Sequence, residues 1–172
     1  MCGIVGYIGS REATPILMNG LKKLEYRGYD SAGVAILHDG VIKMVKTKGR
    51  LTTLESKLGD TDLTGHLGIG HTRWATHGEP NDVNSHPHIS SSGKIAVVHN
   101  GIIENFMKLK EFLISKGYHF QSDTDTEVVA NLIDYNYKGD LVKAVMNTLN
   151  DIEGAYALGV ICTDCPDEFV AA

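Results

Sequence analysis

The sequence predicts an α+β fold in which helices separate runs of strands that stack in layers. Residues 3–9 are apolar and β-prone almost from the start of the chain. Two further β-prone runs, 31–37 and 41–47, flank Asp39-Gly40, a dipeptide that favours a two-residue hairpin turn. Later apolar residues recur at helical spacing. The length of 172 residues fits one domain with a substantial core.

The first helix is expected directly after the first strand. Thr14 would be its N-cap and Pro15 would lie in its first turn. Leucines at 51, 54 and 58 mark a short helix after the hairpin. Strands return at 68–74 and 94–99, and a long segment rich in Gly, Pro, Asn, His and Ser joins them. A loop of that length inside a compact domain indicates a functional or disordered segment.

The second half of the chain favours helices followed by strands. Apolar spacing indicates amphipathic helices around 109–113, 128–133 and 141–149. Residues 155–162 and 168–171 then resemble a final pair of strands. The chain stops within that last apparent strand, so we expect it to be a piece of a longer protein.

The composition is that of an ordinary globular protein and excludes several partners. The net charge is −5, the pI is about 5.9, and no basic patch dominates, so nucleic acid is not an expected partner. The longest apolar run, 155–162, is far shorter than the ~18 residues of a membrane span. The N-terminus lacks the basic region of a signal peptide, so we expect a cytoplasmic protein without membrane contact.

The cysteines and histidines do not predict a cofactor. An odd number of cysteines at low density argues against a disulfide framework, and the Cys162–Cys165 pair has no partner pair for zinc. His86 and His88 lack the carboxylate-histidine pattern of a metal site. No glycine-rich nucleotide motif is present. We therefore expect neither a metal nor an organic cofactor.

Cys2 is the residue whose position carries the most chemical information. It follows the initiator methionine, and removal of Met1 would leave a thiol and a free α-amine on one residue. The thiolate is a nucleophile, and an α-amine with a pKa of ~7.7–8.0 can accept its proton at neutral pH. From position alone, the simpler interpretation is that Cys2 is incidental or a small buried apolar residue.

Five polar segments accompany Cys2. They are residues 26–33, 71–80, 84–88, 97–105 and 122–127. In this order, behind the opening Met-Cys-Gly-Ile-Val-Gly, they resemble class II glutamine amidotransferases, whose glutaminase domain belongs to the N-terminal-nucleophile hydrolases. Residues 75–80, 86–88 and 124–127 favour the subfamily that delivers ammonia to fructose 6-phosphate over phosphoribosyl-pyrophosphate amidotransferases and asparagine synthetases.

The resemblance covers the whole chain, 1–172, and implies a four-layer αββα sandwich of antiparallel sheets, incomplete at its C-terminus. It also implies that Cys2 is the nucleophile and that Asn100 and Gly101 form the oxyanion hole. An Asn side chain and a Gly backbone N–H are suitable donors to a developing oxyanion. Without Cys2, the simpler interpretation of Asn100-Gly101 is a turn.

The same resemblance places glutamine between two opposite charges. Arg73 would bind its carboxylate, since a guanidinium pairs a carboxylate bidentately, and Asp125 would bind its ammonium group. The alternative role of Asp125 is a helix N-cap. Thr76 and His77 would add polar contacts within a mobile loop, 73–81, that closes over the substrate.

Three further residues are assigned by the resemblance, each with a structural alternative. Trp74 would gate the path of ammonia, or be a core aromatic. Arg27 would lie near the amine of the nucleophile, or form an ion pair with Asp30. His86 would pack beside the glutamine loop.

The implied reaction is hydrolysis of L-glutamine to L-glutamate and ammonia. In the full-length enzyme, expected to be a homo-oligomer, ammonia would pass to fructose 6-phosphate bound by sugar-isomerase domains that this chain lacks. Two alternatives stay open: another N-terminal-cysteine amidohydrolase, or a glutamine-binding module without turnover.

Overall fold

The computed structural model describes residues 2–27, 30–74 and 79–172, with the backbone but not the side chain of Arg27. The elements in chain order are β1 (Gly3–Ile8), α1 (Ala13–Leu24), η1 (Glu25–Arg27), β2 (Ser31–His38), β3 (Val41–Lys48), α2 (Leu51–Gly59), β4 (Leu67–Arg73), β5 (His88–Ile89), β6 (Ile95–Ile103), α3 (Phe106–Ser115), α4 (Asp125–Asn136), α5 (Leu141–Asp151), β7 (Gly154–Cys162) and β8 (Val170–Ala171). The predicted α+β class is confirmed. β5 is a short strand within the segment predicted as one long loop.

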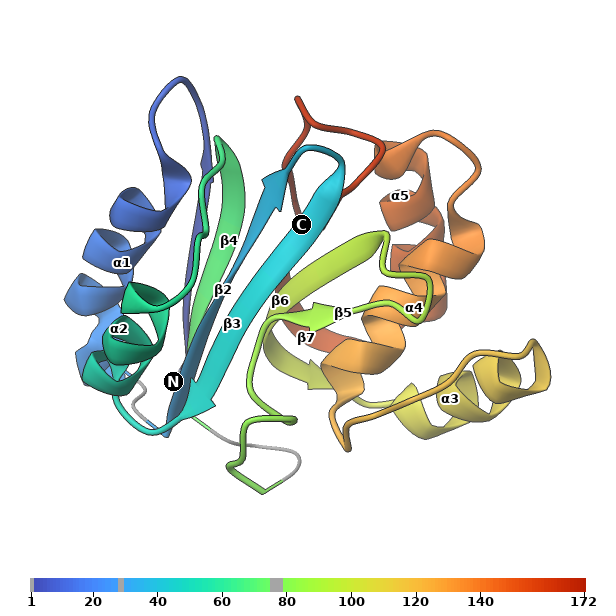
Figure 1. The fold of residues 1–172 in the computed structure, drawn as a ribbon. Coiled ribbons are helices and arrows are strands. Elements are labelled where there is room, and N and C mark those ends of the chain that lie inside the picture. The colour runs from blue at the N-terminus through green and yellow to red at the C-terminus, as the bar shows by residue number, and fades with distance from the viewer. Residues whose placement is uncertain (1, 28–29, 75–78) are drawn as a thin grey trace.

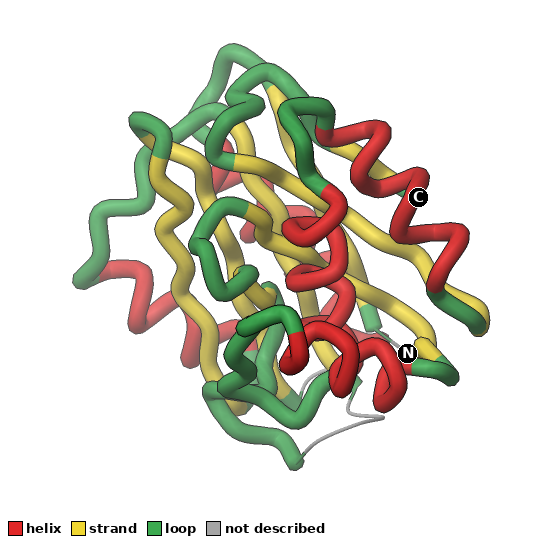
Figure 2. The backbone as a smooth tube through the Cα atoms, turned by 90° about the vertical axis from the view of Figure 1, so that its right-hand side faces the viewer, coloured by secondary structure: helices red, strands yellow, loops and turns green. Residues whose placement is uncertain are grey.

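The strands form two antiparallel sheets that face each other. Their strand orders are β1-β4-β2-β3 and β5-β6-β7-β8. Helices α1 and α2 cover the outer face of the first sheet, and α4 and α5 cover the outer face of the second (Figure 1). In the side view, helices lie across the strands of the second sheet (Figure 2). The four layers are those of an αββα sandwich.

Strand β2 shows how the sequence builds these layers. Successive side chains of a strand point to opposite faces. Val34 and Ile36 pack into the core beneath α1 and α2, whereas Ala35 and Leu37 pack between the two sheets. Both faces of β2 are therefore covered, which explains why this strand is an almost continuous apolar run.

Two local predictions near the N-terminus have different outcomes. Asp39 and Gly40 have φ values of 48° and 74°, and His38 pairs with Val41, so the predicted two-residue hairpin is confirmed. The prediction that Thr14 caps α1 is wrong. The helix begins at Ala13, and the Thr14 hydroxyl instead donates to the Leu63 carbonyl at 2.5 Å.

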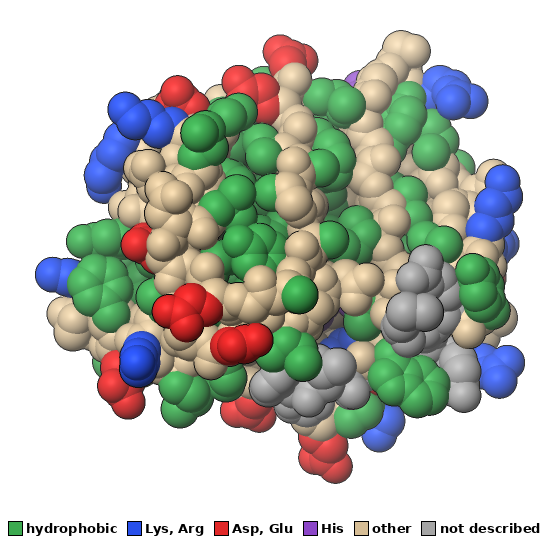
Figure 3. All heavy atoms as spheres, turned by 180° about the vertical axis from the view of Figure 1, so that it is seen from behind, with side chains coloured by type: hydrophobic (Ala, Val, Ile, Leu, Met, Phe, Trp, Pro, Cys, Tyr) green, Lys and Arg blue, Asp and Glu red, His purple; other side chains and the backbone are tan. Residues whose placement is uncertain are grey.

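The surface is of mixed character. Seen from behind, hydrophobic side chains gather in the middle of the face, and acidic and basic side chains stand around its rim (Figure 3). Within the described residues, no helix has both the length and the apolar character needed to cross a bilayer.

Candidate functional site

The start of β1 and the end of β4 bring Cys2 to one end of the sandwich. Antiparallel pairing sets Gly3 against Thr72, so Cys2 lies beside the residues that follow β4. The backbone N–H of Trp74 donates to Cys2 Sγ at 3.3 Å, and the thiol in turn lies 3.5 Å from the Trp74 carbonyl. Burial raises the pKa of Cys2, although the hydrogen bond from Trp74 opposes that shift. The thiol is therefore poorly ionised at neutral pH.

Strand β6 carries Asn100 and Gly101 next to Cys2. The Asn100 side-chain amide donates to the Cys2 carbonyl at 3.4 Å. Both residues lie within β6 and pair with β7, so the alternative interpretation of Asn100-Gly101 as a turn is wrong.

Gly101 occupies a backbone conformation that requires glycine. Its φ is +133°, and a Cβ added there would lie 2.1 Å from the Ala155 carbonyl oxygen. The neighbouring strand thus passes so close that any side chain would displace it. The backbone N–H of residue 101 therefore depends on glycine for its position.

Asp125 is the first residue of α4 and is only 4% exposed. The N-cap is Thr124, whose hydroxyl accepts from the Glu127 N–H, so the alternative role of Asp125 as N-cap is wrong. Asp125 Oδ2 accepts from the Ile103 N–H at 2.9 Å, and Oδ1 lies 3.7 Å from His99 Nδ1. These contacts hold a buried carboxylate next to β6.

Arg73 ends β4 and is 3% exposed. Its carbonyl accepts from the Asp30 N–H at 3.2 Å. Burial lowers the pKa of Arg73, and the negative charges of Asp30, Cys2 and Asp125 oppose this. The buried Arg73 guanidinium thus lies close enough to interact electrostatically with Asp125 and Cys2, two of the residues predicted to form the site.

The other predicted site residues have different outcomes. The Trp74 side chain is 48% exposed, so its alternative role as a core aromatic is wrong. Thr76 and His77 lie outside the described residues, and so does the side chain of Arg27. Their assigned roles stay predictions.

His86 is buried within a cluster of histidines that the sequence analysis did not predict as a group. Its ring centroid lies 4.2 Å from that of His71 and 4.9 Å from that of His88. Burial, reinforced by the other histidines, lowers its pKa well below the ordinary range, so the ring is neutral. No group of His, Cys, Asp or Glu in the described part of the chain is placed to hold a metal ion.

The cysteines near the C-terminus are separate from this site. Cys162 and Cys165 are free thiols, and the Tyr137 hydroxyl lies 3.6 Å from Cys165 Sγ. Burial raises the pKa of Cys162 to about 11. A protonated, buried thiol is a poor nucleophile and a poor metal ligand.

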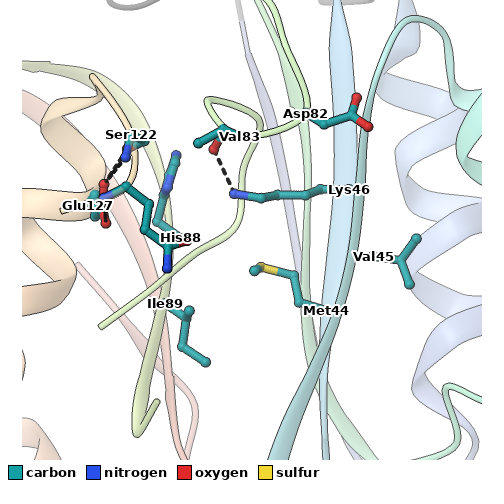
Figure 4. A pocket seen from close by; sticks show the side chains of 10 residues that line it. Met44, Val45, Lys46, Asp82, Val83, His88, Ile89, Ser122 and Glu127 are labelled. Carbon is teal, nitrogen blue, oxygen red and sulfur yellow. Dashed lines mark hydrogen bonds between the residues drawn. The ribbon is translucent and has the colours of Figure 1, made fainter. Parts of the chain in front are cut away.

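A cavity of about 400 Å³ opens between β3 and β5. In Figure 4, Met44 and Lys46 approach it from β3 and His88, Ile89 and Glu127 from the opposite side. Lys46 Nζ donates to the carbonyls of Val83, Ser85 and Pro87, at 2.8, 2.9 and 3.3 Å. The Glu127 carboxylate accepts from the N–H groups of Gln121 and Ser122, at 2.8 and 2.7 Å. Lys46 thus fixes the segment that leads into β5, and Glu127 fixes the segment that leads into α4.

The fold and this end of the sandwich define a class of protein. A family model described as a glutamine amidotransferase domain matches residues 71–172. The chain therefore belongs to the glutamine amidotransferase domain family, in its class II form.

Curated relatives with high sequence identity show which members of the family this chain resembles. The chain is 64% identical over 171 residues to glutamine–fructose-6-phosphate aminotransferase (isomerizing) from Clostridium tetani, covering 99% of this chain and 28% of that protein. It is 53% identical over 172 residues to the protein of the same name from Thermus thermophilus, covering 100% and 28%. The chain thus spans under a third of the length of these curated relatives.

Solved structures agree on the fold. Glutamine phosphoribosylpyrophosphate amidotransferase from B. subtilis, solved in complex with ADP and GMP, aligns with a TM-score of 0.80 and 31% identity. The alignment covers 95% of this chain and 35% of that one. The sandwich of this chain is therefore similar to that of an amidotransferase whose name differs from those of its curated relatives.

Proposed function

We propose that this chain, once Met1 is removed, hydrolyses L-glutamine to L-glutamate and ammonia with Cys2 as nucleophile. The observation that carries the proposal is the convergence of the Cys2 sulfur, the Asn100 amide and the end of β4 at one end of the sandwich. Membership of the glutamine amidotransferase family supports glutamine as the amide.

The first step is attack of the Cys2 sulfur on the side-chain amide carbon of glutamine. Because burial raises the pKa of the thiol, its proton needs an acceptor near neutral pH. The α-amine on the same residue has an ordinary pKa of ~7.7–8.0 and takes that proton. A carbon–sulfur bond forms, and the amide oxygen becomes an oxyanion.

Asn100 and Gly101 stabilise that oxyanion. The Asn100 amide already lies against the Cys2 backbone, and the Gly101 N–H is held by a conformation that only glycine adopts. Loss of one such donor costs ~10²–10³ in rate in other hydrolases. Collapse of the intermediate breaks the carbon–nitrogen bond, and the amine returns its proton to the departing ammonia.

Water completes the cycle. It attacks the γ-glutamyl thioester and forms a second oxyanion, which the same two donors stabilise. Collapse of this intermediate releases glutamate and the free thiol. No oxidant, metal or cofactor enters the balance of either half-reaction.

Arg73 and Asp125 select free glutamine by holding its two charges. The guanidinium pairs with the α-carboxylate and the Asp125 carboxylate with the ammonium group. Both side chains are almost fully buried, which strengthens each charge pair relative to water. Thr76, His77 and His86 add contacts from the segment after β4, with Trp74 at the exit for ammonia and Arg27 near the amine of Cys2.

The relatives suggest a second step beyond this chain. Their name describes transfer to fructose 6-phosphate, and they are more than three times as long as the aligned region. We propose that the chain is a glutaminase domain, 1–172, whose ammonia is used by sugar-phosphate-binding domains of a longer protein.

The decisive experiment measures ammonia and glutamate release from glutamine by the full chain, with removal of Met1 verified by mass spectrometry. Equal release of both products, lost in Cys2→Ala, is expected. A glutamine-mimicking electrophile should add one adduct mass at Cys2. Preference for a different amide would identify another N-terminal-cysteine amidohydrolase, and binding of glutamine without turnover would identify a binding module; either outcome overturns the proposal.

A further inference from the structure

The buried histidine cluster is joined to the proposed site through one hydroxyl group. Thr126 is fully buried, and its Oγ1 lies 3.0 Å from His99 Nδ1 and 3.1 Å from His86 Nε2. His71 Nε2 lies 2.9 Å from the His99 backbone carbonyl. Polar contacts thus run from the end of β4 through β6 and α4 to the segment before β5.

Three members of this chain of contacts lie next to or near a residue of the proposed site. His99 precedes Asn100 on β6, and Thr126 follows Asp125 on α4. His71 lies on β4 shortly before Arg73. The contacts therefore connect the backbone that carries the oxyanion donor to the backbone that carries each of the two charged groups.

The chemistry of the hydroxyl suits this bridging position. A threonine hydroxyl donates one proton and accepts through its lone pairs, whereas a neutral imidazole has one donor and one acceptor nitrogen. Burial keeps the pKa of His86 well below the ordinary range, so its ring is neutral. One ring can donate to Thr126 while the other accepts from it, and no charge is needed within the core.

Removal of the hydroxyl would leave two ring nitrogens without this partner. Both rings are almost fully buried, so water cannot readily replace the lost bonds. His99 Nδ1 also lies 3.7 Å from Asp125 Oδ1, within reach of a small rotation of the ring. Rotation of His99 towards Asp125 would displace the carboxylate relative to Asn100.

We propose that Thr126 is a positioning residue for amide hydrolysis, which holds Asp125, Asn100 and His86 in one relative geometry without touching glutamine itself. The inference rests on the proposed function. It assigns a chemical role to three buried polar residues, His71, His99 and Thr126, that the proposed mechanism does not use.

The test compares Thr126→Val, which keeps the shape and loses the hydroxyl, with Thr126→Ser, which keeps the hydroxyl. Thr148→Val is the matched control, since Thr148 is also fully buried and hydrogen-bonded but lies on α5. Rates in the full chain are normalised to Cys2 sites titrated with the glutamine-mimicking electrophile, so that a smaller folded fraction does not count as lost activity.

We expect Thr126→Val to lower kcat/KM for glutamine by ~10–100-fold, the effect of a small displacement of reacting groups. The kcat/KM values of Thr126→Ser and Thr148→Val should stay within about threefold of wild type, which is well below the loss expected for Thr126→Val. If Thr126→Val does not fold, Thr126→Ala replaces it, because a smaller side chain removes the hydroxyl without added bulk.

The outcomes separate the two proposals. Equal normalised rates for wild type and Thr126→Val overturn the positioning role and leave the glutaminase proposal intact. An equal loss in Thr126→Val and Thr126→Ser, or in Thr148→Val, also overturns it, because the hydroxyl at residue 126 would then not be the cause. A wild-type chain that does not hydrolyse glutamine overturns the proposed function, and the positioning role with it.

Discussion

The backbone N–H of Trp74 donates a hydrogen bond to the sulfur of Cys2 at 3.3 Å, joining residues 72 positions apart in the sequence. The bond fixes the thiol at the end of β4, directly after the buried Arg73. A side chain at the very start of a chain is usually free to move. Here the sulfur of Cys2 accepts from Trp74, and the backbone carbonyl of the same residue accepts from the Asn100 amide.

Retention of Met1 should abolish turnover without preventing folding. An acylated nitrogen on Cys2 is an amide and cannot accept the thiol proton, and general base catalysis contributes ~10²–10⁴ in rate. Chain that retains Met1, prepared with methionine aminopeptidase inhibited, should therefore lose at least ~10²-fold in glutamine hydrolysis. Intact-mass analysis reports the processing state. Equal activity of the two forms would exclude the α-amine as the base.

Gly101→Ala should damage both stability and activity. Its Cβ would lie 2.1 Å from the Ala155 carbonyl oxygen at a φ of +133°. Gly117 is the matched control, because it also has a positive φ, +91°, but nothing lies within 4 Å of an added Cβ. Gly117→Ala should cost only the ~1–2 kcal/mol of an unfavourable φ, whereas Gly101→Ala should cost clearly more. Urea denaturation of the two variants measures the difference, and similar costs would contradict the close approach of the strands.

Asp125→Asn should weaken glutamine binding and spare the fold. The amide oxygen can still accept from the Ile103 N–H, which Asp125 Oδ2 does at 2.9 Å, but the charge opposite the ammonium group is lost. Removing one partner of a buried charge pair costs ~2–5 kcal/mol, so the KM for glutamine should rise at least ~30-fold. Asp123→Asn replaces an exposed carboxylate on the loop just before α4 and is the control. A KM rise of similar size in both variants would argue against a specific role for Asp125.

The layers and most elements of this fold could be predicted because they depend on local pattern. The Asp39-Gly40 turn requires positive φ at both positions, and those residue types supply it. Thr14 was assigned as a cap because its preference for that position is local, but a distant carbonyl, that of Leu63, binds its hydroxyl. A partner 49 positions away leaves no trace in the nearby sequence.

The residues of the candidate site could be predicted through the resemblance to a family. The buried histidines and Thr126 that pack behind them could not. Asn100-Gly101 has the composition of a turn, and only pairing with β7 shows that it lies within a strand. The histidine cluster draws its rings from separate segments, with Thr126 between residues 27 and 40 positions away. Such contacts depend on which faces of the two sheets meet. Histidines inside apolar runs, as at 71 and 99, were the one available signal of polar groups in the core.

Lys46→Met should loosen the segment that leads into β5. The Lys46 ammonium donates to the carbonyls of Val83, Ser85 and Pro87. Burial lowers its pKa to about 8, so it is mostly charged at pH 7. At that pH the variant should lose ~1–3 kcal/mol of the free energy of unfolding and exchange the amide protons of residues 83–86 and 88 faster. Lys48→Met, an exposed position on the same strand, should change stability by less than ~0.5 kcal/mol. Equal protection of the amides of residues 83–86 and 88 in both variants would contradict the anchoring role.

Acid should destabilise the fold through His71. Burial lowers its pKa from an ordinary value of 6.5 to about 3, while its hydrogen bond to the His99 carbonyl opposes the shift. The folded chain therefore binds fewer protons than the unfolded chain between these two values. The free energy of unfolding must then fall as the pH falls from 6.5 towards 3, by up to ~1.4 kcal/mol per pH unit for this group.

The variant His71→Gln tests this dependence. Its amide can still donate to the His99 carbonyl but does not titrate, so the pH dependence of its unfolding free energy should be shallower by up to one proton. Urea denaturation at intervals between pH 6.5 and pH 4.5 measures both slopes within the range over which His71 is expected to remain neutral. The other buried histidines, such as His86, keep some pH dependence in the variant, because burial lowers their pKa values too. Parallel slopes for the variant and the wild type would show that burial does not lower the pKa of His71 in the folded chain.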